Sequence, residues 1–139
     1  MPDMFDDLAV PAELTAQCYI LHPGKKTRIK NANGEEAYIE VYGWHSAAAQ
    51  RFRFEREERM RRLARELSAE ESYDDLGDLI AQLTVSWKLI TPTGRMLDVE
   101  CNYENARKLF NGLDHRWLRQ QVIDFLNNEA NFIPPSWKT

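Results

Sequence analysis

The chain has 139 residues, of which 43% are hydrophobic and 29% are charged, and its formal net charge is -4. This composition is typical of a folded globular domain and argues against a disordered chain. The acidic balance argues against nucleic-acid binding, which normally needs a basic surface. No apolar run approaches the ~18 residues of a membrane-spanning helix, so no membrane partner is expected.

The length predicts one domain with short terminal segments. We expect, in order, an N-terminal arm, a β-hairpin region, a charged helix, a helical core region and a tail, at residues 1–17, 18–43, 44–68, 69–133 and 134–139. Within the arm, Pro11 favours a short helix over Ala12 to Ala16. The first ten residues lack the basic and apolar regions of a secretory signal. Cys18 and Cys101 are expected to be free thiols in a reducing compartment.

The β-hairpin region contains three β-prone runs. Residues 18–21 form the first, and the alternating runs 27–30 and 37–42 are predicted to pair with each other. The dipeptide Asn33-Gly34 between them favours a tight turn because both residues tolerate positive φ. A sheet of two or three strands is not stable alone, so it is expected to pack against another element.

The charged helix is predicted to begin at Ser46, whose hydroxyl suits an N-cap. Arginines dominate the run from residue 51 to residue 65, and glutamates alternate with them. Three glutamate–arginine pairs have the i, i+4 spacing that stabilises helices: Glu55–Arg59, Glu57–Arg61 and Glu58–Arg62. The apolar stripe is thin, with Phe52, Met60, Leu63, Ala64 and Leu67 as its members. The helix is therefore expected to project into solvent or to lie against a partner.

Three interpretations of these charges remain open: a solvated face, a protein-binding face and a nucleic-acid site. The glutamates and the lack of aromatic residues for base stacking disfavour the third. The arginines could also pair with the acidic segment Glu66 to Asp78 of another copy, which would give a homo-oligomer. Large exposed aromatic residues outside regular elements often mark interfaces, and Trp44 and Trp137 lie outside the predicted elements. The partner-binding candidates are Trp44, Arg56 and Arg59.

The helical core region is predicted to open with a capping box formed by Ser68 and Glu71. The helix should run to Trp87, and Gly77, which costs about 1 kcal/mol relative to alanine, leaves open a break between Tyr73 and Gly77.

A hairpin around Pro92-Thr93-Gly94 is expected next. Asn102 is predicted to cap a helix over residues 103–111, and Asp114 to cap a last helix over residues 115–129. The expected inner positions of these two helices are Ala106, Leu109, Phe110, Leu113, Leu118, Val122, Phe125 and Leu126.

The predicted fold is therefore α+β and mainly α-helical. It combines a small N-terminal antiparallel β-hairpin sheet, a long charged helix and a compact C-terminal helical unit with a short hairpin. The three histidines are isolated, and no motif matches a metal site, a nucleophile elbow or a phosphate-binding loop. No enzymatic activity, cofactor or metal is expected.

Ordered motifs along most of the chain carry a family resemblance. In the N-terminal half they are Tyr19-Ile20-Leu21 with His22-Pro23-Gly24, Asn33-Gly34, residues 39–43 and Ser46. In the C-terminal half they are Leu79-Ile80, Trp87, Thr93-Gly94, residues 102–106 with Leu109-Phe110, Gln120-Gln121-Val122 and Asn131-Phe132-Ile133. With these motifs the chain resembles the tail assembly chaperones of long-tailed phages and prophages. The family commonly has aspartate before the serine, where this chain has His45.

The resemblance implies a non-enzymatic protein of the host cytoplasm that binds the phage tape measure protein, a long helical rod. It further implies that the protein helps to recruit tail tube subunits and leaves before the tail is complete. The alternative is a structural virion component, either a minor tail protein or a head–tail connector protein. A small enzyme or a nucleic-acid-binding regulator is the third hypothesis.

Overall fold

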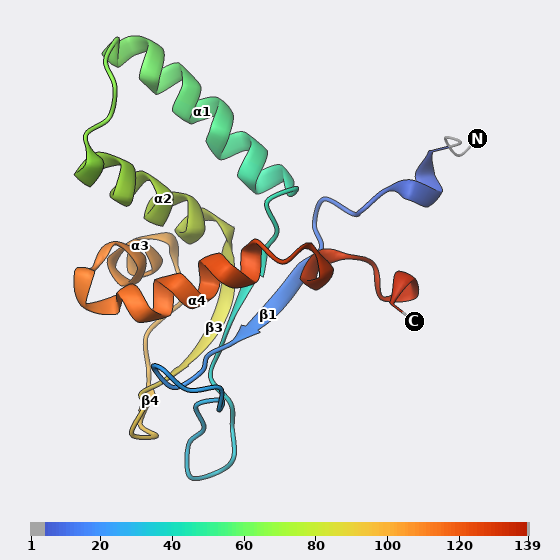
Figure 1. Cartoon of the computed structure of the whole chain (residues 1–139), viewed down its shortest axis with the longest axis vertical. Helices are drawn as coiled ribbons and strands as arrows, with labels where there is room; N and C mark the ends of the chain where they lie inside the picture. Colours follow the sequence, from blue (N-terminus) through green and yellow to red (C-terminus); the bar gives the residue numbers. More distant parts are fainter. Residues whose placement is uncertain (1–4, 139) are drawn as a thin grey trace.

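A computed structural model describes residues 5–138 (Figure 1). The described chain contains a four-stranded antiparallel sheet in the order β1-β2-β3-β4. The strands are β1 (Thr15–Tyr19), β2 (Tyr38–Tyr42), β3 (Thr84–Ile90) and β4 (Met96–Leu97). The α-helices are α1 (Ala47–Leu63), α2 (Ala69–Leu83), α3 (Tyr103–Asn111) and α4 (Arg116–Leu126). Four short 3₁₀ helices complete it: η1 (Asp6–Leu8), η2 (Leu113–His115), η3 (Glu129–Phe132) and η4 (Pro135–Trp137).

One face of the sheet carries the core, and the other face is open. In β2, Ile39 and Val41 are fully buried, whereas Tyr38, Glu40 and Tyr42 between them are only half-buried. This alternation follows from the period of two in a strand. Figure 1 shows α1 and α2 as an antiparallel pair, with α3 and α4 beside α2 and both described ends of the chain on one side of the molecule.

A single hydrophobic core joins the sheet to all four α-helices. Its largest fully buried side chains include Phe110 of α3, Ile80 and Leu83 of α2, and Leu126 and Val122 of α4. The predicted α+β class, with helices predominant, is confirmed. Within residues 5–138, none of the helices has the length and apolarity required to span a bilayer.

Several local predictions are confirmed. The Ser46 hydroxyl accepts a hydrogen bond from the Ala49 N–H, and the capping box of Ser68 and Glu71 is complete. Asn102 caps α3 through the Asn105 N–H at 2.8 Å. The second hairpin joins β3 to β4.

The predicted pairing of residues 27–30 with 37–42 is confirmed only next to the turn, where Lys30 bridges Glu36 and Ile29 bonds Ala37. It does not continue along the strand, because β2 pairs along its length with β1. Residues 27–30 contribute only isolated bridges. The buried Ile29 explains this difference: its N–H donates to Ile20 O at 2.9 Å, and its carbonyl accepts from the Ala37 N–H at 3.0 Å. A residue inserted between the two partners in this way cannot also continue a regular ladder beside β2.

Two predicted element boundaries are wrong for the same physical reason, which is pairing in the sheet. The expected helix over residues 12–16 is absent, since β1 begins at Thr15 opposite Tyr42. The helix predicted to reach Trp87 ends at Leu83, because Trp87 pairs with Ile39 in the sheet. Trp87 is half-buried, and its indole N–H donates to the Val99 carbonyl at 2.8 Å.

The break considered near Gly77 does not occur, and α2 is continuous. Gly77 is buried where α2 meets α3, and a Cβ at this position would overlap the Asn111 side chain. The glycine therefore permits a close approach between two helices, which offsets its low helix propensity.

The start of α4 also differs from the prediction. Asp114 lies within η2 and caps nothing, and α4 begins at Arg116 without a side-chain cap. Leu113, expected on the inner face, is 70% exposed. The helix ends at Leu126, and Asn128 then caps η3 through the Ala130 N–H. Phe132 of η3 packs back onto the core.

Candidate partner-binding surface

Only the first turns of α1 are anchored in the apolar interior. Ala49 and Phe52 are its buried residues. From Arg53 to Leu63 every side chain except that of Met60 is exposed. Leu63 and Ala64, predicted as apolar contacts, therefore contribute little burial. Most of α1 must be held in place by other interactions.

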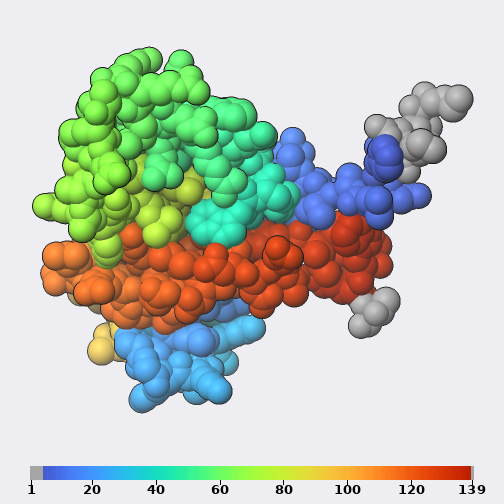
Figure 2. Space-filling model, turned by 45° about the horizontal axis from the view of Figure 1, so that its top comes forward, coloured from blue at the N-terminus to red at the C-terminus, as the bar shows by residue number. Residues whose placement is uncertain are grey.

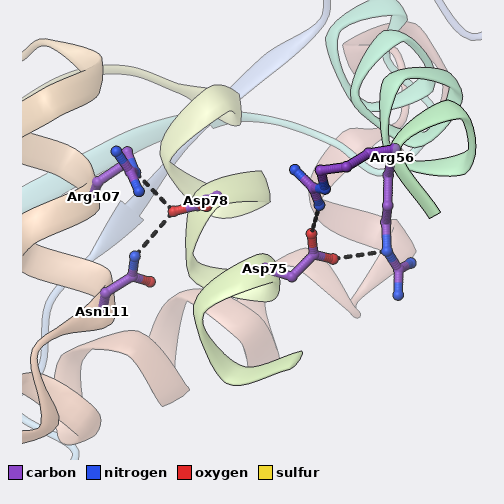
Figure 3. A network of polar contacts seen from close by, with 6 residues as sticks. Arg56, Asp75, Asp78, Arg107 and Asn111 are labelled. Atoms are coloured by element: carbon purple, nitrogen blue, oxygen red, sulfur yellow. Dashed lines mark hydrogen bonds and ion pairs between the residues drawn. The ribbon is translucent and has the colours of Figure 1, made fainter. Parts of the chain in front are cut away.

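Two ion pairs hold the middle of α1 against α2 (Figure 3). Asp75 of α2 accepts from Arg56 Nε at 2.8 Å and from Arg59 Nη2 at 2.5 Å. The Asp75 side chain is only 10% exposed, whereas both arginine side chains are about half exposed. Two of the three predicted partner-binding residues thus lie on the face of α1 that points toward α2.

The turn between α1 and α2 also contains an ion pair between an arginine and a carboxylate. Ala64 ends α1 in the left-handed conformation, with φ of 51°. Arg65 then donates to both carboxylate oxygens of Glu71, at 2.8 and 2.9 Å. These bonds, together with the Ser68 N–H, lower the pKa of Glu71 to about 2. The arginines and the acidic segment, which were considered as contacts between copies, are paired within one chain.

Of the three predicted i, i+4 pairs, Glu58–Arg62 forms within the described residues, at 3.8 Å. The side chains of both residues are more than two-thirds exposed, so this pair contributes little stability. Arg59, predicted to pair with Glu55, pairs with Asp75 of α2 instead.

A second polar cluster fixes the opposite side of α2. Asp78 accepts from Arg107 Nε at 2.8 Å and from Asn111 Nδ2 at 2.9 Å, both on α3 (Figure 3). Arg119 of α4 is 4% exposed, and its Cζ lies 3.5 Å from the centroid of the Tyr73 ring. Burial lowers the pKa of Arg119. Polar contacts therefore clamp α2 between α1 on one side and α3 with α4 on the other.

The outer face of α1 carries the candidate surface, which we call the Phe54 surface. Phe54 is 59% exposed. It lines a hollow of about 460 Å³ whose lining residues are Arg51, Phe54, Glu55, Glu57, Glu58 and Arg61. Arg51, Phe54, Glu58 and Arg61 follow the spacing of one helical stripe. An exposed aromatic ring flanked by charges of both signs is suited to bind a helix with apolar and charged residues.

Sequence reasoning did not single out Phe54, although a signal was present. Phe52 and Phe54 are two residues apart, so on a helix they point to nearly opposite sides. One of them had to leave the interior, and the capped start of α1 buries Phe52.

Trp44 lies elsewhere, in a groove between the two ends of the described chain, which we call the terminal groove. Figure 2 shows these ends beside each other, projecting from the body of the molecule. The groove has a volume of about 340 Å³ and is lined by Val10, Trp44, His45, Leu126, Glu129, Phe132, Ile133 and Trp137.

The aromatic rings of this groove differ in exposure. Trp44 is half-buried and packs against the core, and its indole N–H donates to Asn127 Oδ1 at 2.9 Å. Trp137 is 42% exposed, as expected for a surface aromatic. Trp44 is therefore only partly accessible to a binding partner, and its indole N–H is already bonded.

Groups with chemical reactivity are sparse in the described chain. In residues 5–138, no cluster of three or more His, Cys, Asp or Glu side chains is arranged to hold a metal ion. Cys18 and Cys101 are free thiols, as predicted. Burial raises the pKa of Cys18 to about 12, so this thiol is not a nucleophile near neutral pH.

Comparison of the chain with protein-family models, with curated proteins and with solved structures finds no match.

Proposed function

We propose that the protein is a non-enzymatic tail assembly chaperone that binds the tape measure protein of a long-tailed phage in the host cytoplasm. The sequence resemblance supports the assignment, and the observation that carries it is the Phe54 surface. There an aromatic ring and charges of both signs lie on a helix that contributes little to the core.

The partner of this surface is a helix with a narrow apolar stripe. Its apolar residues cover Phe54, and its carboxylates pair with Arg51 and Arg61. Covering one phenyl ring contributes about 1.5–3 kcal/mol. We expect such an interface to bury less than about 1,200 Å² in total, which is less area than stable complexes bury. Each copy therefore binds weakly, which suits a chaperone that coats a long rod and is then released.

Arg56 and Arg59 have an indirect role in this proposal. They hold α1 against Asp75 and so present the Phe54 surface outward. The terminal groove with Trp44 is the second surface available for a protein partner, and the resemblance names tail tube subunits as further partners.

Co-expression with the tape measure protein tests the function. The soluble fraction of the tape measure protein is measured with and without this chain, and bound protein is quantified by affinity capture. We expect the chain to increase the soluble fraction. A tape measure protein that stays equally insoluble in both cases contradicts the proposed function.

Two matched variants test the surface. Phe54→Asp places a charge in the proposed interface, and we expect it to weaken capture by about tenfold or more. Leu113→Asp changes another exposed apolar residue, on η2 and outside the proposed interface, and should leave capture unchanged. Equal capture by both variants contradicts the placement of the site on α1.

Mass spectrometry of purified virions separates a chaperone from a structural virion component. A chaperone should be nearly absent from finished particles. Abundant peptides of this chain in the particles would favour the structural alternative.

A further inference from the structure

β1 forms one edge of the sheet, and β2 is its strand neighbour. The Ile20 N–H donates to the Ala37 carbonyl at 3.0 Å, just beyond the end of β1. Main-chain groups alternate in direction along a strand. Those of the even-numbered residues of β1 therefore point toward β2, and those of Thr15, Gln17 and Tyr19 point away from the sheet.

In the described chain, hydrogen bonds satisfy the outward main-chain groups of this edge at one end only, although α4 and η3 also contact β1. At Leu21, the next odd-numbered residue, the side-chain amide of Gln121 accepts from the main-chain N–H at 2.8 Å and donates to the carbonyl at 2.9 Å. Within the described chain, no comparable partner serves the outward main-chain groups of Thr15, Gln17 and Tyr19. The open part of the edge thus spans the whole of β1.

Three features that often protect an edge strand, namely charged residues, proline and a β-bulge, are absent from β1. Its sequence, TAQCY, contains no charged residue and no proline, and its register with β2 has no bulge. The opposite edge, β4, has only two residues. Gln17, at the centre of β1, is exposed. β1 is therefore the strand of this sheet that can accept another strand.

We propose that β1 pairs antiparallel with β1 of a second copy, about a two-fold axis at Gln17, so that the two sheets become continuous. In this register Gln17 faces Gln17 of the other copy, and Thr15 faces Tyr19. About six main-chain hydrogen bonds would form, two for each facing pair whose groups point across the edge.

The side chains of this edge are self-complementary. The uncharged Gln17 meets its own copy without repulsion, and threonine opposite tyrosine is a favourable cross-strand pair. On the same open face, Glu40 accepts from the Thr15 hydroxyl at 2.8 Å, and the Arg28 guanidinium lies 4.1 Å from the centroid of the Tyr19 ring. Because Thr15 of one copy faces Tyr19 of the other, the register places Glu40 of one copy on the same side as Arg28 of the other. A second copy therefore fits this edge better than a strand whose charged side chains all have the same sign.

The other route to self-association, between the arginines of α1 and the acids of α2, is less available. Asp75 and Glu71 are already bonded to arginines of their own chain. Self-association through β1 needs no internal ion pair to break.

Sedimentation equilibrium of the purified chain over about 1–200 µM tests the proposal. We expect a concentration-dependent dimer. Gln17→Pro removes the outward N–H at the axis, at an edge position where a folded monomer tolerates proline. It should raise the dimer dissociation constant about tenfold or more. Circular dichroism establishes that the variant is folded.

A charge-exchange experiment identifies the register. Gln17→Lys and Gln17→Glu each place like charges at the axis and should weaken the dimer about fivefold. Mixing the two variants should restore wild-type affinity. Gln82→Lys, at an exposed position of α2, is the matched control and should change nothing.

Three results would overturn the proposal: a monomer at every concentration, a dimer that the Gln17 variants leave unchanged, or no recovery on mixing. None of them bears on capture through the Phe54 surface, so the proposed function is tested separately.

Discussion

α1 and α2 are adjacent helices of similar length, yet they are held by different forces. α1 buries two of its 17 residues, and α2 buries five of its 15. α2 lies against α3 and the sheet through Ile80 and Leu83, which are fully buried. α1 beyond Phe52 is held mainly by Arg56 and Arg59 on a single carboxylate.

The difference shows that an arginine-rich helix can use some of its arginines to attach to its own chain and leave others exposed. On the side of α1 that faces α2, the arginines are bonded to Asp75. On the outer side, Phe54 and Arg61 remain accessible to a partner. Attachment by half-exposed ion pairs is weak and sensitive to salt. A helix attached in this way can carry a binding surface while the core below it supplies the stability.

The largest contrast between the two regions should come from their phenylalanines. Phe110→Ala removes a fully buried ring from α3 and should lower the free energy of unfolding by about 3–5 kcal/mol. Phe54→Ala removes an exposed ring and should change it by less than about 0.5 kcal/mol. Urea unfolding with a constant m value measures both. Similar losses for the two variants would mean that α1 belongs to the core.

An intermediate effect is expected from the carboxylate that joins the two helices. Asp75→Asn removes the charge that attracts Arg56 and Arg59 and should cost about 1–2 kcal/mol, because Asp75 is nearly buried but the arginines are half exposed. The control Glu58→Gln, in an exposed pair, should cost less than about 0.5 kcal/mol. Urea unfolding at low and high salt measures both. A loss of equal size in the two variants would contradict the anchoring role of Asp75.

The smallest effect concerns Glu71 in the turn that follows α1. Its pKa is lowered from 4.5 to about 2, first by Arg65 and next by the Ser68 N–H. Because the folded pKa is depressed, the stabilising contribution is present above pH 4.5 and is lost as the pH falls toward 2. An NMR titration of the Glu71 carboxyl group should show a higher midpoint in Arg65→Leu. The control Arg62→Leu should leave the midpoint in place, and a shift of equal size there would contradict the assigned partner.

The features that could be predicted from the sequence are those set by neighbouring residues, such as helix caps and hairpins. The caps at Ser46, Ser68 and Asn102 lie within three residues of the groups they bond, so local patterns identify them. The buried alternation of Ile39 and Val41 and the hairpin between β3 and β4 were predictable for the same reason.

Several of the failures involve partners distant in the chain. The segment from residue 84 to residue 87 continues the pattern of α2, but pairing with β2 makes it a strand. From the sequence alone, Gly77 is a candidate helix breaker. Its role becomes clear only from the structure, where it lies against the Asn111 side chain, 34 positions later. Asp75 could not be named as the partner of Arg59, because the connection between α1 and α2 sets which turns of the two helices meet.

Native-state hydrogen exchange tests most directly whether α1 beyond Phe52 is held independently of the core. We predict that the amides of residues 53–63 exchange through a local opening of lower free energy than those of α2 and α3. In Phe110→Ala, protection should fall in α2 and α3 and stay unchanged in residues 53–63. Equal protection of α1 and α3, decreasing together in the variant, would contradict the account.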